Sequence, residues 1–378
     1  IRAADPVVTA AGGRLRFEVF SQCCGVYARA DMMPDMLNAD TFGKGTTNVD
    51  FNPPMRAALS KVRAGSPLDL KVTPDAVAID TGHDQETEHK VDLPVRWLKG
   101  FAEVQALAAG LERAATLPGP AARQFLGGLS NQVKARDKAW LIPSGNSLRL
   151  SQRAADNAIA AGGLGRLIAM KPLARHAEAL HIYASSSGIS AFELDFGSAR
   201  FMLVLSAAAS RGFSGEGQLL KALSASNADA ALARVRAALA WQSGIRVDDL
   251  ARDLKAPEQQ VDTALSLLAA QGLVGVDPHE RGYFHRVLPF DLSRIEGLHP
   301  RLKAARALFA DGAVINEKAA RGVVRSKVRT RDATHRVQLE DDDFKCTCVW
   351  HSRTLGQSGP CKHVLATMIA NQEGTAGS

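Results

Sequence analysis

Three cysteines and one histidine near the C-terminal end of the sequence have the spacing of a metal site. Cys346 and Cys348 form a C-x-C pair, twelve residues follow, and Cys361 and His363 form a C-x-H pair. Three thiolates and one imidazole are a complete ligand set for a tetrahedral structural Zn²⁺ site. The chain has only five cysteines in 378 residues, so buried thiols without a metal explain this clustering poorly. The spacing predicts one structural zinc ion per chain.

The residues around these ligands predict strands and a helix that would position them. Strands are expected at 323–328, 334–339 and 344–350. Because positions two apart in a strand share a face, both sulfurs of the C-x-C pair should point the same way. A polar loop at 353–360 leads to an expected helix at 361–371. His351 is a weaker candidate ligand, since its use would break the pair at the start of that helix.

The segment 344–366, which reads FKCTCVWHSRTLGQSGPCKHVLA, resembles the SWIM zinc finger. Members of that family have a C-x-C pair, a variable loop and a C-x-H pair in a ββα arrangement. The resemblance implies the same four ligands, a metal without a catalytic role, and binding to DNA or to proteins. Such fingers occur in bacterial, plant transposase and chromatin contexts. Bacterial members often accompany MoxR-type AAA+ ATPases and von Willebrand A domain proteins, which the resemblance alone implies as partners.

A cluster of basic residues precedes the zinc ligands. Within sixteen positions the sequence has six cations and one acid, Asp332; the cations are Arg321, Arg325, Lys327, Arg329, Arg331 and Arg336. Alternation along a strand predicts that the four from 325 to 331 share a face, from which they could contact phosphates with salt-dependent affinity. A solvated face that only keeps the module soluble is the alternative. The sequence leaves both open.

A second pattern lies upstream of the zinc ligands. Helices are expected at 228–241, 247–254 and 257–271 and strands at 273–276 and 282–288, an order that resembles a winged helix-turn-helix. The third helix offers Gln259 and Gln260 to bases, although its carboxylates would repel phosphates. The expected wing has a mildly basic edge that includes Arg281 and Arg286. Protein docking is at least as well supported as DNA binding.

Residues 1–225 are the least informative part of the sequence. Strands are expected at 15–20, 68–72, 76–79, 181–184, 189–195 and 201–205, and helices at 95–114, 121–134 and 151–159. This alternation predicts a mixed α+β region and not a helical array. The sequences at the start of the helices expected near Phe101 and Phe213 are similar. This similarity allows two duplicated units, at about 1–115 and 116–225.

Three features of residues 1–225 could suggest an enzyme. Glycine-rich loops at 162–165 and 212–217 lack the lysine and hydroxyl of a phosphate-binding loop, so turns explain them better. A polar cluster is expected at an exposed hairpin tip; it contains His83, Asp84, Glu86, Glu88 and His89. His176 and His181 have no partner that the sequence can place. An enzymatic site in this region therefore stays an alternative.

Composition limits the remaining possibilities. The formal net charge is +7, and 46% of residues are hydrophobic and 22% charged, as in ordinary globular proteins. No apolar run approaches the ~18 residues that a membrane span needs, and no secretory leader is evident. The sequence does not begin with Met, which leaves its native start open. Scarce cysteines favour a reducing compartment, so a cytoplasmic location is expected.

Together these patterns predict a multidomain α+β protein. A mixed α/β region is expected at 1–225, a winged-helix domain at 226–290, and a ββα zinc-binding module at 291–378. We expect a non-enzymatic protein that binds nucleic acid or acts as an adaptor in a larger complex. A scaffold that binds only proteins is the second hypothesis and an enzyme is the third. No membrane association and no small-molecule substrate are expected.

Overall fold

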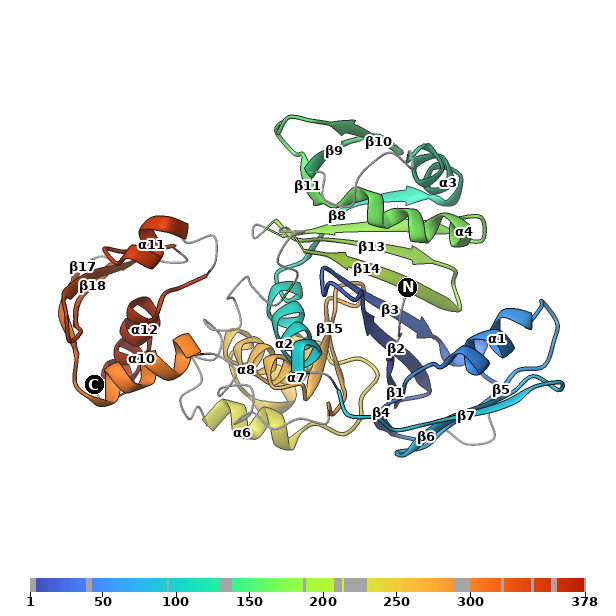
Figure 1. Ribbon diagram of the computed structural model, residues 1–378, viewed down its shortest axis with the longest axis horizontal. Helices are drawn as coiled ribbons and strands as arrows, with labels where there is room; N and C mark the ends of the chain where they lie inside the picture. The colour runs from blue at the N-terminus through green and yellow to red at the C-terminus, as the bar shows by residue number, and fades with distance from the viewer. Residues whose placement is uncertain are drawn as a thin grey trace.

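The computed structural model describes residues 5–38, 43–93, 95–129, 138–185, 188–206, 213, 230–288, 300–320, 323–340, 343–354 and 359–376. Helices and several sheets are both present, which confirms the predicted α+β class. Figure 1 shows a large sheet at one side, the C-terminal sheet with its helices at the other, and helices α2, α6 and α8 between them. No described helix combines the length and the apolarity that crossing a bilayer requires.

An eight-stranded antiparallel sheet dominates the first two hundred residues. Its strand order is β4-β1-β2-β3-β14-β13-β12-β8. The strands are β1 (Val7–Ala11), β2 (Arg14–Phe20), β3 (Val26–Met32), β4 (Gly45–Asn48), β8 (Glu112–Pro118), β12 (Ala179–Ala184), β13 (Ser190–Asp195) and β14 (Ala199–Leu205). The pairing of β3 with β14 joins two halves of the sheet that are distant in sequence.

One face of this sheet is covered by apolar packing. Leu180, Phe192 and Leu203 point to this face from three adjacent strands and pack with helix α3 (Gly119–Gly128). The same cluster includes the sheet β10-β9-β11 and the turns that follow it. These elements are β9 (Lys138–Ser144), β10 (Ser147–Ser151), β11 (Ile159–Gly162), η2 (Leu164–Met170) and α4 (Lys171–Ala174).

A smaller sheet lies beyond β4. Its order is β5-β6-β7, and helix α1 contacts β7. The elements are η1 (Pro34–Met36), α1 (Pro53–Lys61), β5 (Asp69–Val72), β6 (Ala76–Asp80) and β7 (Gln85–His89). Glu88 of β7 accepts hydrogen bonds from the backbone and side chain of Asn52, directly before α1. The hairpin expected around His83 is therefore present, and its exposed tip lies away from the large sheet's core.

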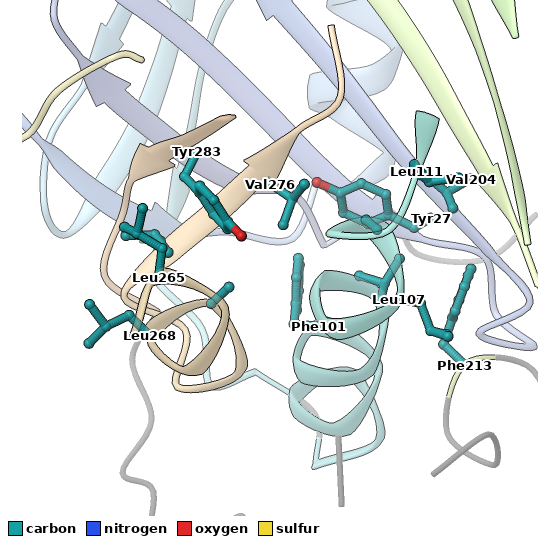
Figure 2. Packing of buried hydrophobic residues seen from close by; sticks show 14 of the residues in the cluster. Tyr27, Phe101, Leu107, Leu111, Val204, Phe213, Leu265, Leu268, Val276 and Tyr283 are labelled. Carbon is teal, nitrogen blue, oxygen red and sulfur yellow. The ribbon is translucent and has the colours of Figure 1, made fainter. Parts of the chain in front are cut away.

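The other face of the large sheet shares one hydrophobic core with the helices that follow it. Helix α2 (Val95–Ala108) inserts Phe101 and Leu107 between the sheet and helix α8 (Figure 2). Tyr27 and Val204 come from the sheet side, whereas Leu265 comes from α8. Residues on both sides of the predicted boundary near 225 therefore pack together.

Three helices and a hairpin occur where the winged-helix pattern predicts them. They are α6 (Ala230–Ala237), α7 (Val247–Leu254), α8 (Glu258–Ala270), β15 (Val274–Asp277) and β16 (Gly282–His285). Every residue of β15 and β16 is buried. The expectation of a solvent-facing wing is wrong for this hairpin, because it packs on α2 and the large sheet.

The C-terminal module is a four-stranded sheet, β17-β18-β19-β20, with helix α12 against it. Its elements are α10 (Pro300–Ala310), β17 (Val314–Ala320), β18 (Val323–Arg329), β19 (Thr334–Glu340), β20 (Asp343–Cys346), α11 (Val349–Thr354) and α12 (Lys362–Ala376). The expected strand at 344–350 is too long: it ends at Cys346, and the short helix α11 begins at Val349. Strand β17 and helix α10 were not predicted. Helices α10 and α12 pack with Ala102 of α2 and Ala270 of α8.

Two helix predictions in residues 1–225 are wrong. The helix expected at 95–114 ends at Ala108, because β8 begins at Glu112 and pairs with β12. The helix expected at 151–159 is absent from those described residues, because strands β10 and β11 pair with β9 on either side of a turn. Residues 130–134, 212, 214–217, 226–229, 321 and 355–358, which also carried predictions, lie outside the described part of the chain.

Candidate metal centre and basic face

The four predicted zinc ligands come from three elements of the C-terminal module. Cys346 is the last residue of β20, and Cys348 directly precedes α11. Cys361 precedes α12, and His363 lies in its first turn. The structure therefore brings together a strand end and the starts of two helices.

The geometry of this group fits one zinc ion. Cys346, Cys348, Cys361 and His363 are all buried, and their ligand atoms lie within 4.8 Å of one another. Nδ1 of His363 is 3.8 Å from the sulfurs of Cys346 and Cys361. A sulfur and a nitrogen on a tetrahedral zinc, at ~2.3 and ~2.0 Å from the metal, are about 3.5 Å apart. The cluster can hold a single zinc ion.

Local electrostatics favour a thiolate at Cys361, whereas the pKa values of Cys346 and Cys348 are raised. A hydrogen bond from Cys346 lowers the pKa of Cys361 to about 3 and raises the pKa of Cys346 above that of an ordinary thiol. The backbone N–H of Val364 also lowers the pKa of Cys361. This contact belongs to the start of α12, where the helix dipole favours negative charge. Cys361 therefore presents a thiolate that can bind a cation.

Two further histidines lie beside the ligands. The backbone N–H of His351 donates to the sulfur of Cys348 at 3.4 Å, while its ring lies against Phe344. His351 is not part of the ligand cluster. The ring of His335 lies 4.1 Å from that of His363, centre to centre. Nothing in the spacing of His335, which lies on β19, indicated this contact.

The predicted basic ladder is present on β18. Arg325, Lys327 and Arg329 are exposed and alternate with buried Ser326 and Val328. Val328 packs with the zinc ligands, so the cations occupy the opposite face of the sheet. Arg331 is exposed beyond the end of the strand.

Neighbouring strands extend this basic face into a groove. Arg336 of β19 is the cross-strand partner of Lys327, and Lys345 of β20 pairs with Gln338. These residues line a groove of about 420 Å³ together with Arg325 and Glu317. Glu317 of β17 forms an ion pair with Lys327 at 2.7 Å. Four cations thus face one carboxylate across the groove.

The predicted nucleic-acid-binding residues on α8 and at the hairpin differ in their exposure to solvent. Gln259 and Gln260 are exposed in the first turn of α8. Arg281 is exposed at the hairpin turn, where it has a positive φ of 52°. Arg286 is completely buried and forms an ion pair with Glu18. The expectation that Arg286 contacts nucleic acid is wrong, because its guanidinium is buried and paired with a carboxylate inside the protein.

Arg286 belongs to a buried ionic network between the hairpin and the large sheet. Arg16 and Arg29 share Asp31, at 2.9 and 2.8 Å, and Arg29 also contacts Asp277 of β15 at 3.0 Å. Burial would raise the pKa of Asp277, but Arg29 and Arg16 outweigh it and hold that pKa well below its usual range. This network fixes β15 on the sheet.

An aromatic ring completes the network. The guanidinium of Arg16 lies 4.2 Å from the centre of the Phe284 ring. That ring covers Gly275, where an added Cβ would lie 2.2 Å from it. Only glycine permits this approach, so the hairpin, the ring and the cations form one closely packed unit.

A cavity lies between the first 225 residues and the helices that follow. It measures about 450 Å³ and is lined by the end of α2, the start of β8, α7, α8 and the hairpin. Arg113, Asp262, Arg281 and Tyr283 are among its polar residues. Tyr283 donates to Asp262 at 2.9 Å. The sequence did not predict this cavity because its walls come from distant segments.

A second group of metal-ligand side chains is present within the described residues. It comprises His181, Asp195 and His279, each with one ligand atom within 4.8 Å of the others. Burial lowers the pKa of His181. The sequence identified His181 without a partner, and the structure supplies two. The residues around His83 do not form such a group, and Glu88, which was expected at the exposed tip, is buried.

Comparisons with known proteins do not identify a family. No family model and no curated protein match the chain. Similar solved structures include Proliferating Cellular Nuclear Antigen from Entamoeba histolytica, at 11% identity and a TM-score of 0.37. A. fulgidus PCNA bound to the C-terminal region of FEN-1 gives 11% and 0.38, and the PCNA2–PCNA3 complex from Sulfolobus tokodaii gives 10% and 0.36. Each match covers 54% of this chain and 89% of the other; at these TM-scores the likeness carries no functional argument.

Proposed function

We propose that this protein binds the phosphate backbone of nucleic acid through the basic groove of a SWIM-type zinc module. The observation that carries the proposal is the placement of Arg325, Lys327, Arg336 and Lys345 on one exposed sheet face. Phosphate contacts supply most of the affinity of sequence-independent binding. No base-reading side chain is needed for this function.

The zinc ion would support the groove from the opposite face of the sheet. By joining β20 to the start of α12, it would hold the strands on which the cations lie. Structural zinc contributes folding free energy to small modules that have little core of their own. Its role here is therefore structural, with no reaction assigned to the metal.

Polarisation of a labelled DNA single strand and of a DNA duplex, measured at several salt concentrations, tests this function. We expect affinity to fall as the salt concentration rises. In a plot of the logarithm of the binding constant against that of the salt concentration, each phosphate contact steepens the slope by about 0.7 for single strands and about 0.9 for duplexes. Replacing Arg325, Lys327 and Arg336 by Gln should weaken binding and lower the slope by about two to three.

A matched control changes the same number of exposed cations outside the zinc module. Arg56, Lys71 and Arg149 are exposed on α1, β5 and β10. Their replacement by Gln changes net charge equally and should leave the slope unchanged. Binding that is insensitive to salt, or equally weakened by both triple variants, would contradict the proposal.

A scaffold that binds only proteins is the second candidate, and exposed apolar residues favour it. Val349 and Trp350 of α11 are 64% and 43% exposed. Arg301 lies over the Trp350 ring at 5.0 Å. The SWIM resemblance suggests a MoxR-type AAA+ ATPase or a von Willebrand A domain protein as partner. Retention of such proteins by the wild type but not by Trp350→Ala, without salt-sensitive DNA binding, would favour the scaffold.

A further inference from the structure

We propose that His181, Asp195 and His279 bind a divalent transition-metal ion of the zinc class. The three residues meet where the turn between β15 and β16 contacts strands β12 and β13. His181 and Asp195 come from adjacent strands of the large sheet, and His279 comes from the hairpin turn. This site is separate from the cysteine cluster and goes beyond the proposed nucleic-acid function.

The distances suit a metal ion. Nε2 of His181 lies 3.5 Å from Oδ2 of Asp195, and a ligand atom of His279 lies within 4.8 Å of both. With Zn–N and Zn–O bonds of ~2.0–2.2 Å, two ligands of a tetrahedral zinc are about 3.4 Å apart. Two imidazoles and one carboxylate are an established type of zinc ligand set. The ligand atom of His279, within 4.8 Å of the other two, would have to approach to this separation on metal binding.

The second nitrogen of each imidazole is already held by a neighbour. Nδ1 of His279 lies 2.6 Å from Oε1 of Glu193, and Nδ1 of His181 lies 3.0 Å from the hydroxyl of Thr116. Tyr183 in turn donates to Glu193 at 3.2 Å. Histidines that bind metals nearly always donate their other N–H to a carboxylate, carbonyl or water. These contacts occupy Nδ1 of both rings, so Nε2 of each ring is the nitrogen assigned to the ion.

The site is sheltered but accessible. The side chains of His181, Asp195 and His279 are 10%, 22% and 18% exposed. Three protein ligands leave a fourth position for water or a small anion. An ion bound here would also connect the hairpin to the sheet, alongside the ionic network around Asp277. Because the unfolded chain lacks this geometry, metal binding should stabilise the folded protein.

Titration of Zn²⁺ into the tag-free full chain, with its cysteine cluster already loaded, tests the proposal. We expect one further saturable equivalent by calorimetry and metal analysis. Co²⁺ added as a second probe should bind without increasing the sulfur-to-cobalt charge-transfer absorption, because no thiolate takes part. Absence of a second equivalent would overturn the proposal.

Variants assign the equivalent to these residues. His279→Ala and Asp195→Asn should each weaken the second equivalent by more than the ~10–100-fold that loss of an outer partner causes. Asp195→Asn should fold, because Oδ1 of Asn can still accept the hydrogen bond from the Gly197 N–H in the turn. If His279→Ala does not fold, Asp195→Asn alone tests whether these residues bind the metal. Glu193→Gln should weaken binding by about 10–100-fold through its hold on His279.

The control is His83→Ala, which removes an exposed histidine of the β6–β7 hairpin. It should leave the second equivalent unchanged. A second equivalent that persists at full affinity in Asp195→Asn and folded His279→Ala would overturn the site. Loss of the second equivalent in His83→Ala would also overturn the proposed site.

Discussion

Cys361 lies where the end of β20, the start of α11 and the start of α12 come together. Its sulfur is close to those of the other two ligand cysteines and to Nδ1 of His363. A hydrogen bond from Cys346 gives it the lowered pKa that a metal-binding thiolate needs. Cys361 is therefore a suitable residue at which to test metal binding by the module.

Replacing Cys361 by Ser should abolish metal binding at the cysteine cluster. We expect the sulfur-to-cobalt absorption of the Co²⁺-loaded wild type to disappear, since a hydroxyl is a far weaker ligand than a thiolate. Cys23→Ser is the control, because Cys23 is an exposed thiol outside the cluster. Retention of the full absorption in Cys361→Ser would show that this sulfur is not a ligand.

Single residues also show what could be read from the sequence. The ligand spacing predicted a cluster that the structure assembles, because C-x-C and C-x-H pairs have local geometry. Arg286 was misassigned because a cation on the strand of an expected wing usually faces solvent. Its partner Glu18 is 268 residues away, and no local pattern could show that pairing.

At the scale of elements, the hairpin β15–β16 is held by charge as well as by apolar packing. Asp277 faces two guanidinium groups, and the three side chains are at most 1% exposed. A buried charge that loses its partner remains desolvated without compensation. The hairpin should therefore be more sensitive to substitution than a surface turn.

Replacing Asp277 by Ala should lower the free energy of unfolding by about 3–5 kcal/mol, the usual cost of breaking a buried ion pair. Denaturant unfolding followed by circular dichroism measures this change. Asp248→Ala removes an exposed carboxylate of α7 that is paired with Arg246, and should change stability little. Equal unfolding midpoints for the two variants would contradict a stabilising role for the network.

Elements were predictable where their periodicity was local. Helix α7 occupies the predicted range Val247–Leu254, and α8 differs from its prediction only at the ends. The first three residues of strand β8, 112–114, were read as the end of a helix. The pairing of β8 with β12 overrides the helical pattern. Long-range strand pairing was the information that the sequence pattern lacked.

At the scale of the whole molecule, we expect two cores to differ in their dependence on metal. The core around Phe101 joins the large sheet, α2 and the helix-hairpin unit, whereas the zinc ligands belong to a separate small cluster. A third cluster, which includes Leu302 and Leu365, joins the zinc module to α2 and α8. Loss of zinc should therefore loosen one end of the protein.

Hydrogen exchange with and without a chelator tests this division. Removing zinc should increase exchange in β18, β19, β20 and the start of α12, and leave β2, β3 and β14 protected. The reason is that the core around Phe101 contains no residue of the zinc module. A uniform increase across the chain would mean that the module and the large sheet unfold as one cooperative unit.

The pairing of β3 with β14 has a consequence for synthesis on the ribosome. Val26 pairs with Leu205, so β3 is made on the order of ten seconds or more before its partner, at ~5–20 residues per second. During that interval its edge can join strands of other nascent chains. Arg29 and Asp31 interrupt the apolar pattern of this edge, and inward charges are a known protection against such pairing. We expect ribosome-bound chains that stop before residue 199 to aggregate more when Arg29 and Asp31 are both replaced by Val, as sedimentation would measure.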